Sequence, residues 1–528
     1  PPPPTTALAR TGTAAGPSAS AVVSDIPEVG SGSAVAQAEL DHMMGGMANM
    51  PMTRQSGEAI AVAAAAPEGA GGLGTEYSPE VGINSRKARE ESVNVQTATT
   101  RFVRTSVGGL PSVSTAAVVS REPFVKRSAR LDGDQPGSGR GASSPQTNAA
   151  IEAGLAFLAR YQRPDGRWSL QGFDDATNAV SEDERRFMLV SDTGATALAI
   201  LAFQGWGKNH REGEYRDVLH RGINHLLAQQ KASGDLFVPA DDRSNQSVWL
   251  YSHALATLAL CEAYGMTGDP DLKEPAQRAI DFIVATQNRD LGGWRYSPEY
   301  DASGAIIGGV GTDTSVTGWM VAALYSARGA ELAVPSETFA RIEKWMNSAQ
   351  GPGGESHLYR YNPYAPDTVQ QRHGRVPSKT MTAVGLLSRS LLGWKPDHPA
   401  LGRGAEFLEA NRPSIGTARE PLRDTYYWYY ATLALVYLKE RDPARYEPVW
   451  QEWEAALHPI LRNSQEKQGP WSGSWNPRGP VPDRWGLHAG RLYVTTMNLL
   501  SLEANYRYLP FHAAVQGQAR ETQATSAP

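Results

Sequence analysis

Six positions with chemically capable side chains recur along this chain, roughly 60 residues apart, each at or beside the start of an apolar segment. They are Asp192, His253, Asp313, Lys379, Asp424 and Tyr493. The three aspartates are each followed directly by a threonine. Carboxylates, an imidazole and an amine that meet in one place can act as general acids, general bases or stabilisers of a cation.

A structural interpretation of the same positions stays open beside the chemical one. Asp before Thr is a good helix N-cap, because its carboxylate accepts hydrogen bonds from free N–H groups and complements the helix dipole. A histidine at a helix end is often simply packed. Lys379 is less easily explained, since a positive charge near a helix N-terminus is unfavourable and indicates a nearby carboxylate or an anionic ligand. The catalytic candidates are therefore Asp313, Asp192, Asp424, His253 and Lys379.

Aromatic and basic side chains gather at or near the same starts and predict a ligand-binding wall. Core packing would account for many of the aromatic residues, but tyrosine in such quantity needs hydroxyl partners and favours a ligand platform. Basic residues from the loops at 351–378 and 476–492 add affinity for an acidic or hydroxylated ligand. The expected ligand-binding residues are Trp249, Trp319, Tyr427, Trp428, His373, Arg375, Arg491 and Tyr493.

The segments that carry these residues read as helices that are apolar or small nearly all round, for example HALATLALCEAY from His253. Such helices are covered on most sides. Amphipathic helices precede them, with apolar residues at helical spacing such as Ile151, Leu155 and Leu158. Six buried and six amphipathic helices predict an all-α fold, an α6–α6 toroid of helix hairpins in a closed ring. An open solenoid is the alternative, because it also stacks helix pairs.

The loop between the paired helices repeats as well. It reads YQRPDGRW at 161–168, TQNRDLGGW at 286–294 and SQEKQGPWSGSW at 464–475, with degraded copies at 229 and 349. We expect Gln to satisfy carbonyls at the end of the first helix, Gly to turn the chain and Trp to cover the helix end.

This loop resembles the QW repeat of squalene and hopene cyclases and, more broadly, the toroids of terpenoid cyclases and protein prenyltransferases, over about residues 148 to 510. The resemblance implies an α/α toroid. Class II cyclases protonate an alkene with the central acid of a D-x-D-D motif; here Thr312 stands at that position and only Asp313 remains. Prenyltransferases hold zinc with Asp, Cys and His, but Cys261 has no D-x-C beside it.

Composition excludes several classes of protein. The net charge is −5 with acidic and basic residues well mixed, so no basic stripe predicts nucleic-acid binding. One cysteine allows neither an intrachain disulfide nor a cysteine-based zinc site, and we expect no metal and no cofactor. No apolar run is long enough to cross a membrane.

Residues 1–147 are rich in Ala, Gly, Ser and Pro, whereas all 13 Trp lie beyond residue 160. We expect a disordered low-complexity arm or linker over 1–147, one toroid over 148–512 and a disordered tail over 513–528. The arm is a possible contact for a protein partner. Because the first residue is Pro, we expect a missing upstream signal or anchor and an exported or envelope-anchored protein; a trimmed cytoplasmic tail is the alternative.

The sequence thus leaves three functional hypotheses. The leading one is binding of an isoprenoid or glycan-type ligand in an aromatic central cavity, without the class II cyclase acid. The second is an enzyme, either a divergent terpenoid cyclase or prenyltransferase or a polysaccharide lyase-type toroid. The third is a structural or protein-interaction ring.

Overall fold

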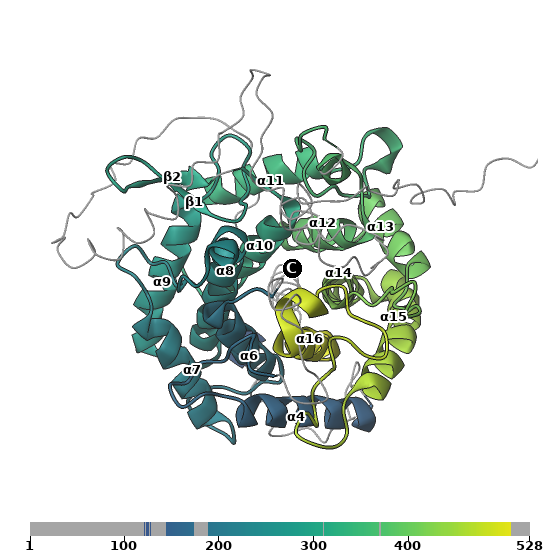
Figure 1. The fold of residues 1–528 in the computed structure, drawn as a ribbon. Helices are drawn as coiled ribbons and strands as arrows, with labels where there is room; N and C mark the ends of the chain where they lie inside the picture. The colour runs from purple at the N-terminus through teal and green to yellow at the C-terminus, as the bar shows by residue number, and fades with distance from the viewer. Residues whose placement is uncertain are drawn as a thin grey trace, which may run out of the picture.

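The computed structural model describes residues 121, 123–125, 127, 144–173, 188–309, 311–368 and 371–507. Outer and inner helices alternate along the described chain (Figure 1). The outer helices are α4 (Pro145–Arg160), α7 (Arg216–Ala228), α9 (Pro270–Ala285), α11 (Ser336–Ala349), α13 (Pro399–Ala410) and α15 (Pro443–Ser464). The inner helices are α6 (Asp192–Gly205), α8 (Asp242–Thr267), α10 (Thr314–Gly329), α12 (Lys379–Leu391), α14 (Thr425–Arg441) and α16 (Gly486–Leu502).

The inner helices form a closed ring. Each one packs on the inner helix before it and the one after it, and α16 packs back on α6. Each also packs on the outer helix that follows it in the chain, and α16 packs on α4 in the same way. The outer helices surround the inner ones as a second layer (Figure 1). We call the end where the inner helices begin the front end and the opposite end the rear end.

Burial explains why the two sets of helices differ in sequence. In α6 every residue after Asp192 is buried, and α14 is buried from Thr425 to Lys439. In α11 burial is confined to one stripe, which includes Ile342, Trp345 and Met346. An inner helix has protein on nearly all sides, whereas an outer helix faces solvent on one side, which is why only the outer helices are amphipathic.

The repeated loops join neighbouring hairpins. The indole Nε1–H of Trp168, Trp294 and Trp475 donates to the carbonyl of Leu158, Ile283 and Leu461 respectively, each at 2.8 Å, near the end of the preceding outer helix. The expectation that Gln satisfies these carbonyls is wrong, since Trp does so.

The glutamine side chain reaches forward instead. Gln287 Nε2 donates to the carbonyl of Gly292 in its own loop at 2.8 Å and to that of Thr338 in the next outer helix at 3.1 Å. Gln465 makes the same pair of bonds to Gly473 at 2.9 Å and to Ala150 in α4 at 2.7 Å. The last loop is therefore bonded to the first outer helix by the same pair of bonds that ties the loop at Gln287 to the outer helix after it.

Irregular segments complete the front end. Strands β1 (Pro298–Tyr300) and β2 (Ile306–Gly309) form an antiparallel hairpin between α9 and α10, and the short 3₁₀ helices η1 (Gly353–Glu355) and η2 (Arg372–Arg375) lie between α11 and α12. At the rear end, α17 (Ala504–Arg507) follows α16 and contacts α6 and α14.

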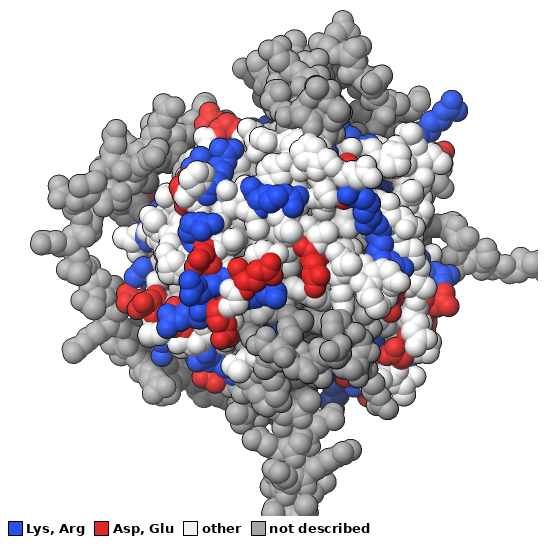
Figure 2. All heavy atoms as spheres, turned by 90° about the horizontal axis from the view of Figure 1, so that it is seen from below, with Lys and Arg blue, Asp and Glu red and all other residues white. Residues whose placement is uncertain are grey.

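Among the described residues, no helix is both long and apolar enough to span a membrane. On the face seen from below, Lys and Arg side chains are interspersed with Asp and Glu (Figure 2).

Candidate functional site

The aspartates at the front end divide into two kinds. Asp313 and Asp424 are N-caps: Asp313 Oδ1 accepts from Val316 N–H at 2.8 Å, and Asp424 Oδ1 accepts from Tyr427 N–H at 2.9 Å. Asp192 does not cap its helix. Ser191 Oγ does so, by accepting from Gly194 N–H at 2.9 Å.

The carboxylate of Asp192 instead faces the first repeated loop. Its Oδ2 lies 3.1 Å from Arg167 Nε, and both side chains are about one-third exposed. This pair lies in the first hairpin, away from the aromatic cluster described below. Asp192 is therefore placed as a partner of the loop arginine rather than as a member of that cluster.

His253 is not at a helix start, and this expectation is wrong. Helix α8 begins at Asp242, so His253 lies inside it and is fully buried. Its Nε2–H donates to the carbonyl of Ala279 in α9 at 3.0 Å, and its Nδ1 accepts from Leu236 N–H at 3.2 Å. The imidazole thus bonds two neighbouring segments to α8, which is a packing role.

A buried carboxylate accompanies this histidine. Asp235 Oδ1 lies 3.4 Å from His253 Nδ1, and its Oδ2 accepts from Lys231 Nζ at 2.6 Å and from Trp249 Nε1–H at 3.1 Å. Burial alone would raise the pKa of Asp235, but the neighbouring His253 and the charge of Lys231 outweigh it and lower the pKa to about 2. Trp249 is thereby committed to this group, stacked on Phe237 at 5.4 Å.

Lys379 lies at the front end in the first turn of α12, where Ser378 provides the cap. Its ammonium lies over the ring of Tyr427, 4.9 Å from the centroid. Burial lowers the pKa of Lys379, the charge of Asp424 raises it, and that of Arg484 lowers it. Among the described residues no carboxylate lies within ion-pair distance of this half-buried ammonium.

An aromatic cluster fills the front half of the ring interior. Trp319 of α10 stacks on Tyr429 of α14 at 5.3 Å and meets Tyr430 edge-on at the same distance. Tyr426 lies 6.4 Å from Trp319 and 5.9 Å from Trp485. Helices α10 and α14 are not neighbours in the ring, so these side chains meet across its interior.

A chain of hydroxyl groups crosses the ring beside this cluster. Tyr251 Oη donates to Ser315 Oγ at 2.6 Å, and Ser315 Oγ is 2.8 Å from Tyr426 Oη. The three residues belong to α8, α10 and α14. Burial raises the pKa of Tyr251 and Tyr426, with a further contribution from the charge of Asp313 to both.

Charged groups line one side of the cluster. Trp485 Nε1–H donates to Asp424 Oδ1 at 3.3 Å, and Arg484 Nε lies 4.0 Å from Asp424 Oδ2. Tyr493 belongs to the same group. Gly490, where φ is 74°, divides α16 into two helices, and Tyr493 lies in the first turn of the second, near its predicted start. Burial raises the pKa of Tyr493 well above its usual value, and the charges of Asp483 and Asp424 add to this.

Asp483 is a member of this charged group that the sequence analysis missed. Its Oδ2 accepts from Thr425 N–H at 3.1 Å and its Oδ1 from Trp485 N–H at 3.0 Å. Burial raises its pKa to about 6, although Arg423, with Nε at 3.9 Å from Oδ2, opposes the shift. The sequence did carry a signal for this residue, since an Asp stands directly before Arg484 and Trp485 in the loop at 476–492. Both oxygens of Asp483 are occupied, so it holds the loop on the start of α14.

The remaining predicted ligand-binding residues lie elsewhere. Trp428 is buried in α14 at 1% exposure, and Arg491 donates to Ser474 Oγ at 2.9 Å beneath Trp471. His373 and Arg375 are in η2, where Arg375 pairs with Asp367 at 3.8 Å. Of the predicted residues, Lys379, Asp424 and Tyr493 lie near one another, and Trp319 and Asp313 lie beside Tyr426. Tyr427 lies under the Lys379 ammonium but packs on Trp453 of the outer helix α15 and donates to the carbonyl of Asn411 at 2.8 Å.

The described residues contain no group of three His, Cys, Asp or Glu side chains that could hold a metal ion. The group around Asp424 and Asp483 is instead balanced by Arg423 and Arg484. Lys379 and Arg484 place positive charge at this end of the ring, and Trp319 and Tyr426 beside them are buried, at 3% and 6% exposure.

No protein-family model matches the chain. Over 205 residues it is 26% identical to drimenyl diphosphate synthase of Streptomyces showdoensis, covering 36% of this chain and 34% of that protein. The chain thus matches about a third of the length of this relative.

Solved structures that resemble the fold include the type II terpene cyclase MstE of Scytonema, with a TM-score of 0.43, 15% identity and coverage of 70% of this chain and 100% of that one. Another is an α-1,6-mannanase of Salegentibacter sp. HEL1_6, with a TM-score of 0.45, 11% identity and coverage of 68% and 98%. The chain is a mainly helical α/α toroid with distant sequence similarity to drimenyl diphosphate synthase.

Proposed function

We propose that this toroid binds an isoprenoid-type ligand at its front end, with the apolar part on the aromatic cluster and an anionic end at Lys379 and Arg484. The observation that carries the proposal is the ammonium of Lys379. It is half-buried over the Tyr427 ring, its pKa is lowered by burial, and no described carboxylate lies within ion-pair distance of it. An anionic ligand group would supply the missing counter-charge.

The side chains around Lys379 favour a ligand with a large apolar part over a free anion. Exposed large apolar side chains occur on the loops that lead into α10, α12 and α14, at the front end: Tyr300, Ile307, Tyr364, Val376, Ile415 and Leu422. Large apolar groups on a surface are costly to solvate and commonly mark a binding or entry site. The name of the distant relative, a diphosphate synthase of the drimenyl series, agrees with an isoprenoid that carries an anionic group.

We further propose that the chain does not carry out protonation-initiated cyclisation. Thr312 stands where the acid of the cyclase motif would be, and a hydroxyl group cannot protonate an alkene. Its side chain is buried at 1% exposure and packs near Gly293. We expect no cyclic product from squalene with the unmodified protein or with Thr312→Asp; product detected by gas chromatography would favour the enzyme hypothesis instead.

Binding is tested with farnesyl diphosphate, farnesol and inorganic diphosphate as separate probes in calorimetric titrations. Farnesyl diphosphate is expected to bind more tightly than either part. Lys379→Met should weaken farnesyl diphosphate about tenfold, which corresponds to about 1.4 kcal/mol, and leave farnesol unchanged. The matched control is Lys395→Met, an exposed lysine beyond the end of α12, which should change neither.

Two outcomes would overturn the proposal. One is the absence of saturable binding of farnesyl diphosphate to a folded protein. The other is equal loss of binding in both lysine variants, which would indicate a general effect of charge. Saturable binding of an oligosaccharide such as mannotriose, with no binding of the isoprenoid probes, would favour the glycan alternative.

A further inference from the structure

A short segment from the N-terminal arm is packed on the rear end of the ring. Phe124 is 1% exposed and Arg127 is 5% exposed, whereas Val125 between them is 49% exposed. The sequence analysis placed these residues within the arm, yet the described part of segment 121–127 buries two side chains in the folded domain. Phe124 and Arg127 are thus docked on the ring while Val125 faces solvent, as in a bound peptide.

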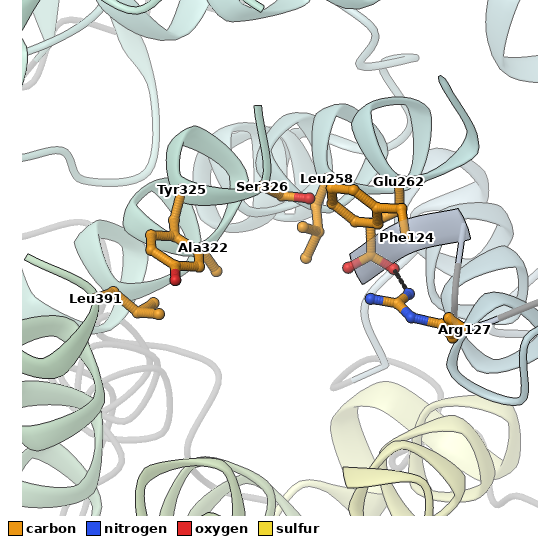
Figure 3. A pocket seen from close by; sticks show the side chains of 8 residues that line it. All are labelled: Phe124, Arg127, Leu258, Glu262, Ala322, Tyr325, Ser326 and Leu391. Atoms are coloured by element: carbon orange, nitrogen blue, oxygen red, sulfur yellow. Dashed lines mark hydrogen bonds and ion pairs between the residues drawn. The ribbon is translucent and has the colours of Figure 1, made fainter. Parts of the chain in front are cut away.

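Arg127 is the polar anchor of this segment. Its Nη1 lies 2.8 Å from Glu262 Oε2, and its Nη2 donates to the carbonyl of Arg507 at 2.6 Å. Glu262 also pairs with Arg507 Nη2 at 2.9 Å, and all three side chains are nearly fully buried. Figure 3 shows Arg127 reaching Glu262 at one side of a small pocket that Phe124 also lines. A buried charge needs such partners, so the position of Arg127 is strongly specified.

Phe124 is the apolar anchor, and α8 makes room for it with a glycine. A Cβ at Gly265 would lie 2.6 Å from the Phe124 ring. Gly265 lies inside a regular helix, where glycine costs about 1 kcal/mol relative to alanine. It does not have the positive φ that explains many glycines; Gly268 nearby, at φ 66°, does. The close approach of Phe124 therefore accounts for Gly265.

A further buried acid, Glu503, lies close to Arg127 and Arg507. Neither side-chain oxygen of Glu503 has a hydrogen-bond partner among the described residues. Burial raises its pKa well above the usual value, and the charges of Arg507 and Arg127 lower it in part. Removing Arg127 would withdraw one of the two cations that face this group, so the acid supports binding of a guanidinium group here.

We infer that the rear end of the ring is a peptide-binding site for a segment of the form Phe-x-x-Arg, which residues 124–127 of the same chain fill and which another copy of that segment can enter. The site is built from Gly265 and Glu262 of α8, Gln204 of α6 and Arg507 of α17. The inference is independent of the proposed front-end ligand.

The test uses the full chain with its own anchors removed, Phe124→Ala together with Arg127→Ala, and a fluorescent peptide of residues 119–129. The peptide should bind this variant saturably and at least tenfold more weakly to the unmodified chain, whose site is occupied. Adding Gly265→Val to the variant should abolish binding, because the branched side chain occupies the place of Phe124. Adding Ser326→Ala, on the same pocket wall, should leave binding unchanged.

Equal binding to the unmodified chain and the variant, or no binding to a folded variant, would overturn the inference. If the variant does not fold, the unmodified protein still provides a test. Excess peptide should displace the chain's own segment and speed tryptic cleavage after Arg127 severalfold, whereas a peptide with alanine at the Phe and Arg positions should not. Cleavage at the same rate with both peptides would contradict an exchangeable site.

Discussion

Single residues show where a sequence pattern is sufficient and where it is not. The capping roles of Asp313 and Asp424 follow from Asp before a helical segment. Asp192 has the same pattern but is preceded by Ser191, an equally good cap, so the helix boundary shifts by one residue. His253 was misplaced because the polar first turns of α8, from Asp242, read as a loop.

The contacts at the front end could not be predicted from the sequence, for a different reason. The aromatic residues at the helix starts were predicted to gather; Trp319 and Tyr493 both lie near Tyr426, whereas Tyr427 packs on Trp453 of an outer helix. Their partners were not predictable, since the hydroxyl chain joins residues 64 and 111 positions apart in the sequence. Which pairs meet across a ring depends on helix rotation, which hydrophobic periodicity does not determine when a helix is apolar all round.

The Asp235 carboxylate gives a prediction at this scale. Its pKa of about 2 lies below the ordinary 3.8, so its contribution to stability is fully present above about pH 4 and is lost as pH falls toward 2. Asp235→Asn should lower the free energy of unfolding by about 2 kcal/mol at pH 7, with a difference that shrinks as pH falls. Urea unfolding at pH 7, 4 and 2.5 measures this.

Asp242→Asn, at an exposed position at the start of α8, serves as the control and should change stability by less than about 0.5 kcal/mol. A loss from Asp235→Asn that stayed constant down to pH 2.5 would show that shape or hydrogen bonding, rather than charge, makes this residue stabilising.

At the scale of elements, the repeated loop was found from sequence but its bonding was not. The spacing of Gln, Gly and Trp predicts where outer helices end. Trp294 covers that end as expected, and its N–H satisfies the free carbonyl. Gln287 bonds to the next outer helix, which a local pattern cannot indicate because its acceptor at Thr338 is 51 residues away.

We predict that Gln287→Leu leaves the carbonyls of Gly292 and Thr338 without their donor and costs about 2 kcal/mol in unfolding free energy. Gln162→Leu removes the equivalent bonds to Gly166 and Val218 at a half-buried site, where water can replace them, and should cost less than about 1 kcal/mol. Chemical denaturation of the two variants makes the comparison. Equal losses of unfolding free energy would mean that burial of the glutamine side chain does not determine how much its hydrogen bonds stabilise the protein.

At the scale of the whole molecule, a closed ring was preferred to a solenoid because neither end of the helical array has a polar capping repeat. The structure brings α16 against α6 and α15 against α4. The first and last hairpins therefore meet each other through the same surfaces that join the other hairpins.

Ring closure predicts the behaviour of a nicked chain. A protease site inserted between Ser303 and Gly304, at the exposed tip of the β1–β2 hairpin, would divide the ring into two fragments. We expect the fragments to remain associated, because two separate interfaces join them, and to elute as one species in size-exclusion chromatography. Separation without denaturant would show that the chain connection, rather than the packing, keeps the ring closed.

The forward direction of the glutamine bonds has a consequence for how the domain comes apart. Gln287 and Gln465 each link one hairpin to the next, and the bond from Gln465 to Ala150 leaves no terminal hairpin with a free side. A linear array can fray from its ends one unit at a time, whereas a ring must first break somewhere in its middle. Loss of this domain should therefore be a single cooperative event, and partly unfolded forms should be scarce at equilibrium.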